Sequence, residues 1–64
     1  MANSISWNKI HRQFVKQFPL TNKHVLHWCP SDHLTIKLYL DDGSLASYNY
    51  LENDIRHLEE RWKE

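Results

Sequence analysis

The stretch Leu34–Leu40 alternates strictly between apolar and polar side chains, and this alternation constrains the fold more than any other part of the 64-residue chain. Leucine or isoleucine stands at every even-numbered position, and Thr35, Lys37 and Tyr39 stand between them. Successive side chains of a β-strand point to opposite faces of the sheet. The pattern therefore predicts a strand with one buried face and one open face.

The turn after this strand fixes the register of the next strand, Ser44–Tyr50. Asp41-Asp42-Gly43 has the composition of a hairpin turn. A two-residue loop would place Ser47 and Asn49 in the core, whereas a three-residue loop with Gly43 in the left-handed conformation brings the apolar side chains together. We therefore predict the three-residue loop, which pairs Leu40 with Ser44, Leu38 with Ala46, Ile36 with Tyr48 and Leu34 with Tyr50.

An earlier strand is predicted over Lys23–Cys29, because β-forming residues there end at a proline. If Pro30-Ser31-Asp32 is the loop, Trp28 pairs with Leu34 and points inward together with Leu26. A four-residue loop would reverse this orientation. We expect Trp28 to point inward.

A helix is predicted before the first strand. Its apolar side chains recur at steps of three and four residues, as on one stripe of a helix, at Trp7, Ile10, Phe14 and Phe18. Ser4 or Ser6 is expected to cap its start. Pro19 should end it near Gln17 or Phe18, because the residue before a proline is pushed out of the helical conformation.

A second helix is predicted from Leu51 or Asn53 to Trp62. Its apolar stripe consists of Leu51, Ile55, Leu58 and Trp62, again at steps of three and four residues. Asn53 is a suitable cap for this helix.

Together these elements predict an α+β fold with the order α-β-β-β-α. The three strands form an antiparallel meander, and both helices pack on one face of it because all the apolar stripes then share one core. Residues 1–64 are expected to form a single small domain. Cys29 is the only cysteine, so aromatic packing has to take the place of disulfides within the chain.

The opposite face of the sheet is left uncovered by this arrangement and is the predicted binding surface. It mixes aromatic, aliphatic and polar groups, as modest protein interfaces do. The residues that we expect to contact a partner are His27, Lys37, Tyr39, Leu45 and Asn49. The expected partner is another protein or a second copy of this chain.

One cluster contains the residue types that bind metals: His24, His27, Cys29 and His33 lie within ten residues. A structural zinc site needs four convergent ligands. His24 and His27 have opposite parity in the predicted strand and would point to opposite faces. A nucleophilic cysteine would also need a lowered pKa and a pocket. We therefore expect no metal, cofactor, catalytic residue or small-molecule substrate, and a protein that is not an enzyme.

Basic side chains support an alternative function. Lys9, Arg12 and Lys16 form a stripe on the first helix, and Lys23 could extend it. Such a stripe can neutralise phosphates, and Tyr39 on the open sheet face could stack on a base. The alternative is therefore a nucleic-acid-binding module that uses this stripe and the sheet. Against it, eight basic and eight acidic residues give a net charge of zero.

The expected order of elements is also that of the double-stranded-RNA-binding domain. That family carries a lysine cluster at the start of its second helix. This chain has Leu51-Glu52-Asn53-Asp54 there. We do not assign the chain to that family.

Residues 1–6 contain neither the basic nor the apolar region of a secretory signal. No apolar run approaches the roughly 20 residues that cross a bilayer. We expect a cytoplasmic protein without a membrane partner. The leading expectation is thus a small, non-enzymatic interaction or accessory module.

Overall fold

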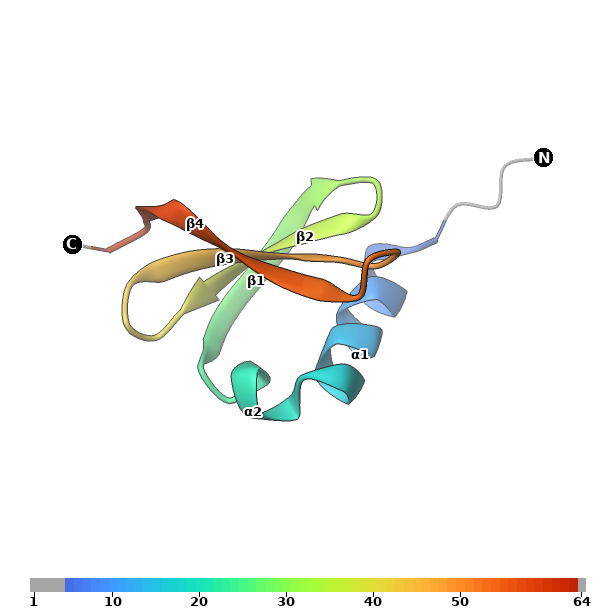
Figure 1. Cartoon of the computed structure of the whole chain (residues 1–64), viewed down its shortest axis with the longest axis horizontal. Helices are drawn as coiled ribbons and strands as arrows, with labels where there is room; N and C mark the ends of the chain where they lie inside the picture. The colour runs from blue at the N-terminus through green and yellow to red at the C-terminus, as the bar shows by residue number, and fades with distance from the viewer. Residues whose placement is uncertain (1–4, 64) are drawn as a thin grey trace.

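The computed structural model describes residues 5–63 and shows helices on one side of an antiparallel sheet (Figure 1). The α+β class is as predicted, but the sheet has four strands in the order β1-β2-β3-β4. The elements are α1 Trp7–Gln17, α2 Pro19–Asn22, β1 Val25–Asp32, β2 Thr35–Leu40, β3 Ser44–Asn49 and β4 Asp54–Arg61.

Helix α1 begins and ends where the sequence predicts. The Ser6 side chain caps its start by accepting a hydrogen bond from the backbone N–H of Lys9 at 3.2 Å. Ser4, the other predicted cap, lies outside the described residues. The helix ends at Gln17, and Pro19 opens the short helix α2, where the missing N–H of proline leaves no hydrogen bond unmade.

The β2–β3 hairpin has the predicted register. Ile36 lies opposite Tyr48, and Leu38 lies opposite Ala46. Gly43 has a φ of 89°, in the left-handed region that glycine adopts without a steric penalty. The three-residue loop is therefore confirmed.

Strand β1 differs from its prediction in length and in part of its orientation. It continues through Pro30 to Asp32, which the strand tolerates because β1 is at the edge of the sheet. Trp28 points inward as expected, but it pairs with Leu38 instead of Leu34. A register shift between Val25 and His27 turns Val25 toward the core. Leu26, predicted to be inside, is 63% exposed.

The predicted C-terminal helix is wrong, because Asp54–Arg61 forms strand β4, paired with β3. Asn53 has a left-handed φ of 52°, and its Oδ1 accepts a hydrogen bond from the Tyr48 hydroxyl at 2.7 Å. This contact closes a turn where the helix was expected to start. The apolar spacing of the segment also suits a strand that uses both faces. Ile55 packs against the helix-side core, and Trp62 lies against Tyr39 on the other side.

Two further expectations depended on the predicted C-terminal helix. The predicted packing of a C-terminal helix beside the first helix is wrong, because residues 54–61 belong to the sheet itself. Helix α1 contributes buried side chains to the core, and α2 contributes none. The element order shared with the double-stranded-RNA-binding domain is also lost.

The core lies between α1 and the facing side of the sheet. The Phe14 ring lies 5.4 Å from the Tyr48 ring, and Phe18 meets the same ring edge-on at 5.8 Å. Burial raises the pKa of Tyr48, and its hydroxyl is satisfied by Asn53. The buried residues of this core are Ile10, Phe14, Ile36, Leu38, Leu40, Ala46 and Tyr48. Within residues 5–63, neither helix has the length and apolarity that a membrane crossing requires.

Gly43 is also where the end of the chain folds back on the sheet. Its carbonyl accepts hydrogen bonds from the backbone N–H groups of Trp62 at 3.0 Å and Lys63 at 3.3 Å. A Cβ at this position would lie 2.6 Å from the Lys63 carbonyl oxygen and 2.9 Å from Nη2 of Arg61. A side chain is therefore excluded both by the backbone conformation and by the close packing.

We predict that Gly43→Ala lowers the free energy of unfolding by on the order of 2 kcal/mol, because it combines left-handed strain with this overlap. Urea denaturation followed by circular dichroism measures the loss. Glu60→Ala, at an exposed position on β4, is the control and should change stability by less than about 0.5 kcal/mol. Equal stability of Gly43→Ala and the wild type would contradict the described turn.

His11 is a residue of α1 whose side chain packs against β1. Its ring stacks on the Trp28 indole with centroids 4.7 Å apart and an interplanar angle of 11°. Burial lowers the pKa of His11 below its ordinary value of 6.5. The folded state therefore prefers the neutral imidazole, whereas the unfolded chain takes up the proton below about pH 6.5.

Because the pKa of His11 is lower in the folded state than in the unfolded chain, we predict that the free energy of unfolding falls as the pH drops from about 7.5 to about 5.5. His11→Phe keeps an aromatic ring against Trp28 but cannot titrate, so its stability should fall less over the same range. Urea titrations of both proteins at several pH values provide the comparison. The same pH slope in both would rule out the described environment of His11.

Candidate functional site

The side of the sheet opposite α1, which we call the outer face, carries all five residues predicted to contact a partner. The register places on it His27 and Cys29 from β1, Thr35, Lys37 and Tyr39 from β2, Leu45, Ser47 and Asn49 from β3, and Arg56 from β4. All four strands therefore contribute to the outer face, and the alternation of side chains along each strand determines which residues point to it.

His27, Cys29 and Tyr39 form one group at the β1 side of this face. The His27 and Tyr39 rings are 5.4 Å apart, and the Cys29 thiol donates to the Tyr39 hydroxyl oxygen at 3.7 Å. The hydrogen bond with Cys29, and then the charge that its thiolate would carry, raise the pKa of Tyr39. These surroundings favour the neutral phenol, which can both donate and accept a hydrogen bond.

Leu45 was expected to be an exposed contact, and this is wrong because only 5% of it is accessible. Trp62 follows the end of β4 and folds over this part of the outer face. Its ring meets Tyr39 edge-on at 6.1 Å, and its Nε1 donates to the Leu40 carbonyl oxygen at 2.7 Å. Trp62 itself remains 38% exposed, so it takes the place of Leu45 at the surface.

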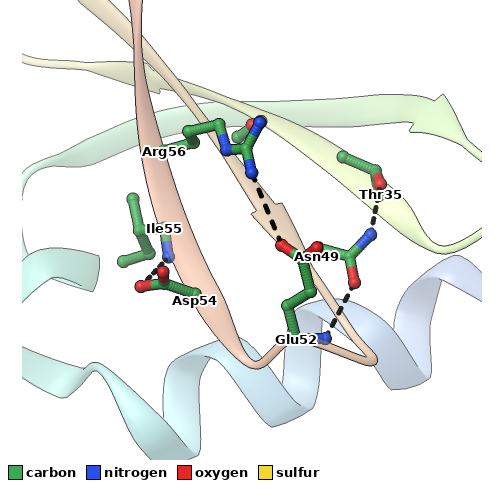
Figure 2. A pocket seen from close by; sticks show the side chains of 7 residues that line it. Thr35, Asn49, Glu52, Asp54, Ile55 and Arg56 are labelled. Atoms are coloured by element: carbon green, nitrogen blue, oxygen red, sulfur yellow. Dashed lines mark hydrogen bonds and ion pairs between the residues drawn. The ribbon is translucent and has the colours of Figure 1, made fainter.

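Asn49 lies in a polar hollow of about 180 Å³ at the other end of the outer face (Figure 2). Its Nδ2 donates to Thr35 Oγ1 at 3.1 Å, and its Oδ1 accepts from the backbone N–H of Glu52 at 2.9 Å. The Arg56 guanidinium is 3.9 Å from Glu52. Asn49 is therefore engaged in holding the β3–β4 turn.

The suspected metal ligands are dispersed. His24 Nδ1 lies 3.0 Å from Asp41 Oδ2, His27 lies against Tyr39, and His33 Nδ1 lies 3.4 Å from Asp32 Oδ1. In the part of the chain that the structure describes, no three histidine, cysteine or acidic side chains are placed to hold a metal ion.

An apolar groove of about 840 Å³, which the sequence did not reveal, lies at one end of the molecule. We call it the end groove. The start of α1 and the β1–β2 and β3–β4 turns meet there (Figure 1). Its apolar lining consists of Ile5, Trp7, Trp28, Pro30, Leu34 and Leu51, and its polar lining of Ser6, Asn8 and His33.

Two side chains give the end groove its shape. The Trp7 indole is fixed as a wall, because its Nε1 donates to the Asp32 carbonyl oxygen at 3.0 Å, yet it is 44% exposed. Leu51 projects from the β3–β4 turn and is 71% exposed. Sequence periodicity assigned both residues to helical core stripes. The exposure of Trp7 could have been expected from its position, because Trp7 is the first residue of α1 and lies at the end of the apolar stripe.

The basic residues predicted for nucleic-acid binding are exposed, but they do not join the outer face. Lys9, Arg12 and Lys16 line one shallow hollow on α1 and form what we call the basic row. Lys23 is at the end of α2. Because α1 covers one side of the sheet and Tyr39 lies on the other, the basic row and Tyr39 do not share one surface.

Comparisons of the chain with models of protein families, with curated proteins and with solved structures give no significant match. We therefore infer the function from the geometry of these surfaces.

We predict that Trp62→Ala lowers the free energy of unfolding by about 2 kcal/mol, because it removes the contact with the Tyr39 ring and the hydrogen bond to the Leu40 carbonyl. The loss should be smaller than for a fully buried tryptophan. Leu20→Ala, at an exposed position of α2, is the matched control and should cost less than about 0.5 kcal/mol. Equal effects of the two substitutions in chemical denaturation would contradict the folded-back position of Trp62.

Proposed function

We propose that the protein is a small, non-enzymatic interaction module that self-associates, with the end groove as the interface between two copies. The observation that carries this proposal is an open apolar groove walled by two tryptophans on a chain with so small a core. Exposed contiguous apolar surface on a soluble domain commonly marks an interaction site. Tryptophans in such pockets are the residues that most often dominate binding energy.

The end groove is better suited to this role than the outer face. Only 5% of Leu45 is accessible, and Asn49 is held by Thr35 and Glu52. The outer face therefore offers mostly polar groups, and its group around Tyr39 would contribute at most to the rim of an interface.

A second copy of the chain is the occupant that the groove fits. Its lining contains no aspartate, glutamate, lysine or arginine, so two grooves can face each other without repulsion between like charges. Leu51 projects from the rim of the end groove, so that the Leu51 side chain of each copy can enter the end groove of the other copy. A two-fold interface requires one self-complementary patch of this kind. Pairing would also extend the core of a domain near the lower size limit for independent folding.

The edges of the sheet are less suited to pairing with another chain. The β4 edge carries charged or imidazole side chains at Asp54, Arg56, His57, Glu59, Glu60 and Arg61. Strand β1 contains Pro30 and two register shifts. Charges, bulges and proline are the features by which edge strands avoid intermolecular pairing.

The chemistry of the described side chains supports binding over catalysis. The Tyr39 pKa is raised away from neutrality, and the nearby Cys29 thiol is joined to Tyr39 with no general base hydrogen-bonded to it among residues 5–63. A free, half-buried thiol suits a reducing compartment such as the cytoplasm.

Sedimentation velocity over about 1–500 μM protein tests the proposal, since self-association depends on concentration. We expect the wild type to shift from monomer to dimer and Leu51→Lys to stay monomeric. Leu26→Lys is the matched control: it makes the same change at a comparably exposed leucine, 63% against 71% accessible, on β1 and outside the groove. It should dimerise as the wild type does.

Two outcomes would overturn the proposal. One is a wild-type protein that stays monomeric throughout this concentration range. The other is a dimer that Leu26→Lys disrupts and Leu51→Lys leaves intact. Circular dichroism of each variant verifies that a change in mass reflects association and not unfolding.

A further inference from the structure

The cations of α1 have no acidic partner among the described residues. The ion pairs within residues 5–63 join His24 to Asp41, His33 to Asp32 and Arg56 to Glu52. None of them includes a residue of the basic row. The sequence contains no acidic residue before Asp32, so none is available on α1 or α2. The basic row therefore presents its positive charge to solvent.

The helix dipole disfavours Lys9 and favours Lys16, which is in the last turn of α1. Lys9 is the third residue of the helix, whose first turn contains no acidic residue. The amino-terminal end of a helix is partially positive and favours anions. Arg12 and Lys16 are four residues apart, where like charges repel. Helix stability therefore accounts only for Lys16, whereas binding of an anionic partner would offset the unfavourable position of Lys9 and the repulsion between Arg12 and Lys16.

The row is straight and lacks aromatic neighbours. The seven helical steps from Lys9 to Lys16 span about 10 Å along the helix axis. The shallow hollow of about 400 Å³ beside them is completed by Ser6 and Gln13, which are polar. Phe14 of α1 is buried against the sheet, Trp7 lines the end groove, and Tyr39 is on the outer face, so none of these rings lines the hollow beside the row. A ligand on the row can thus be held by its charges but not by stacking.

From this combination we infer that the basic row binds the phosphate backbone of duplex nucleic acid without reading its bases. Lysine and arginine side chains neutralise phosphates and release bound counterions, independently of sequence. Proteins that prefer single strands combine such cations with aromatic platforms for the bases. The basic row has the first feature without the second, which favours a duplex. The inference is independent of the proposed self-association, since the end groove and the row share only Ser6.

Fluorescence anisotropy with a labelled 20-base-pair DNA duplex of arbitrary sequence tests the inference. Three phosphate contacts predict a slope of about −2.7 for log K against log salt, which is about a 40-fold loss of affinity between 50 and 200 mM salt. The variant with Lys9, Arg12 and Lys16 all changed to glutamine should lose binding. Glutamine has a helix propensity close to that of lysine and arginine, so α1 is retained.

A charge-matched control separates the row from the overall charge of the protein. Changing Lys37, Arg56 and Lys63 to glutamine removes three cations elsewhere and should retain most of the binding. The single strand of the same sequence should bind at least tenfold more weakly than the duplex.

Absence of duplex binding at 50 mM salt would overturn the inference, whether or not anionic lipid vesicles bind. Equal losses in the two triple variants would overturn it as well, and so would equal or tighter binding of the single strand.

Discussion

The closure of β2 and β3 at Gly43 is the constraint on which the rest of the structure depends. Its left-handed backbone sets the three-residue loop, and this register places Tyr48 opposite Ile36 under α1. The carbonyl of the same glycine accepts the backbone N–H groups that follow β4, which brings Trp62 over Tyr39. One turn thus determines which side chains form the helix-side core and which part of the outer face is covered.

The elements that the sequence predicted are those whose signals are local. The alternation in β2, the glycine of its turn and the stripe of α1 each fit one periodicity, and the structure confirms them. The last strand could not be predicted in this way, because Ile55 and Trp62 satisfy a helical spacing although they pack on opposite sides of the sheet. The strand is instead held by pairing with β3 and by the hydrogen bond from Tyr48 to Asn53, which are contacts that a helical periodicity does not contain.

The same distinction applies to the functional surfaces. Strand parity predicted which residues share the outer face, and helical periodicity predicted the basic row. The exposure of Leu51 in the end groove and the contact of Trp62 with Tyr39 depend on the strand β4, which replaces the expected helix. The resulting molecule separates an apolar groove at one end from a cationic row on α1 and a mainly polar sheet face. Two different partners could therefore be bound without competing for one surface.

Nuclear Overhauser effects from the Trp62 indole test this account most directly. We expect cross-peaks from the Trp62 ring protons to the Tyr39 ring, together with cross-strand contacts between Tyr48 and Ile55. Strong sequential amide–amide contacts through residues 54–62, with contacts from Ile55 to Leu58 and no Trp62–Tyr39 cross-peak, would instead indicate a helix. That result would contradict the described fourth strand and the surfaces derived from it.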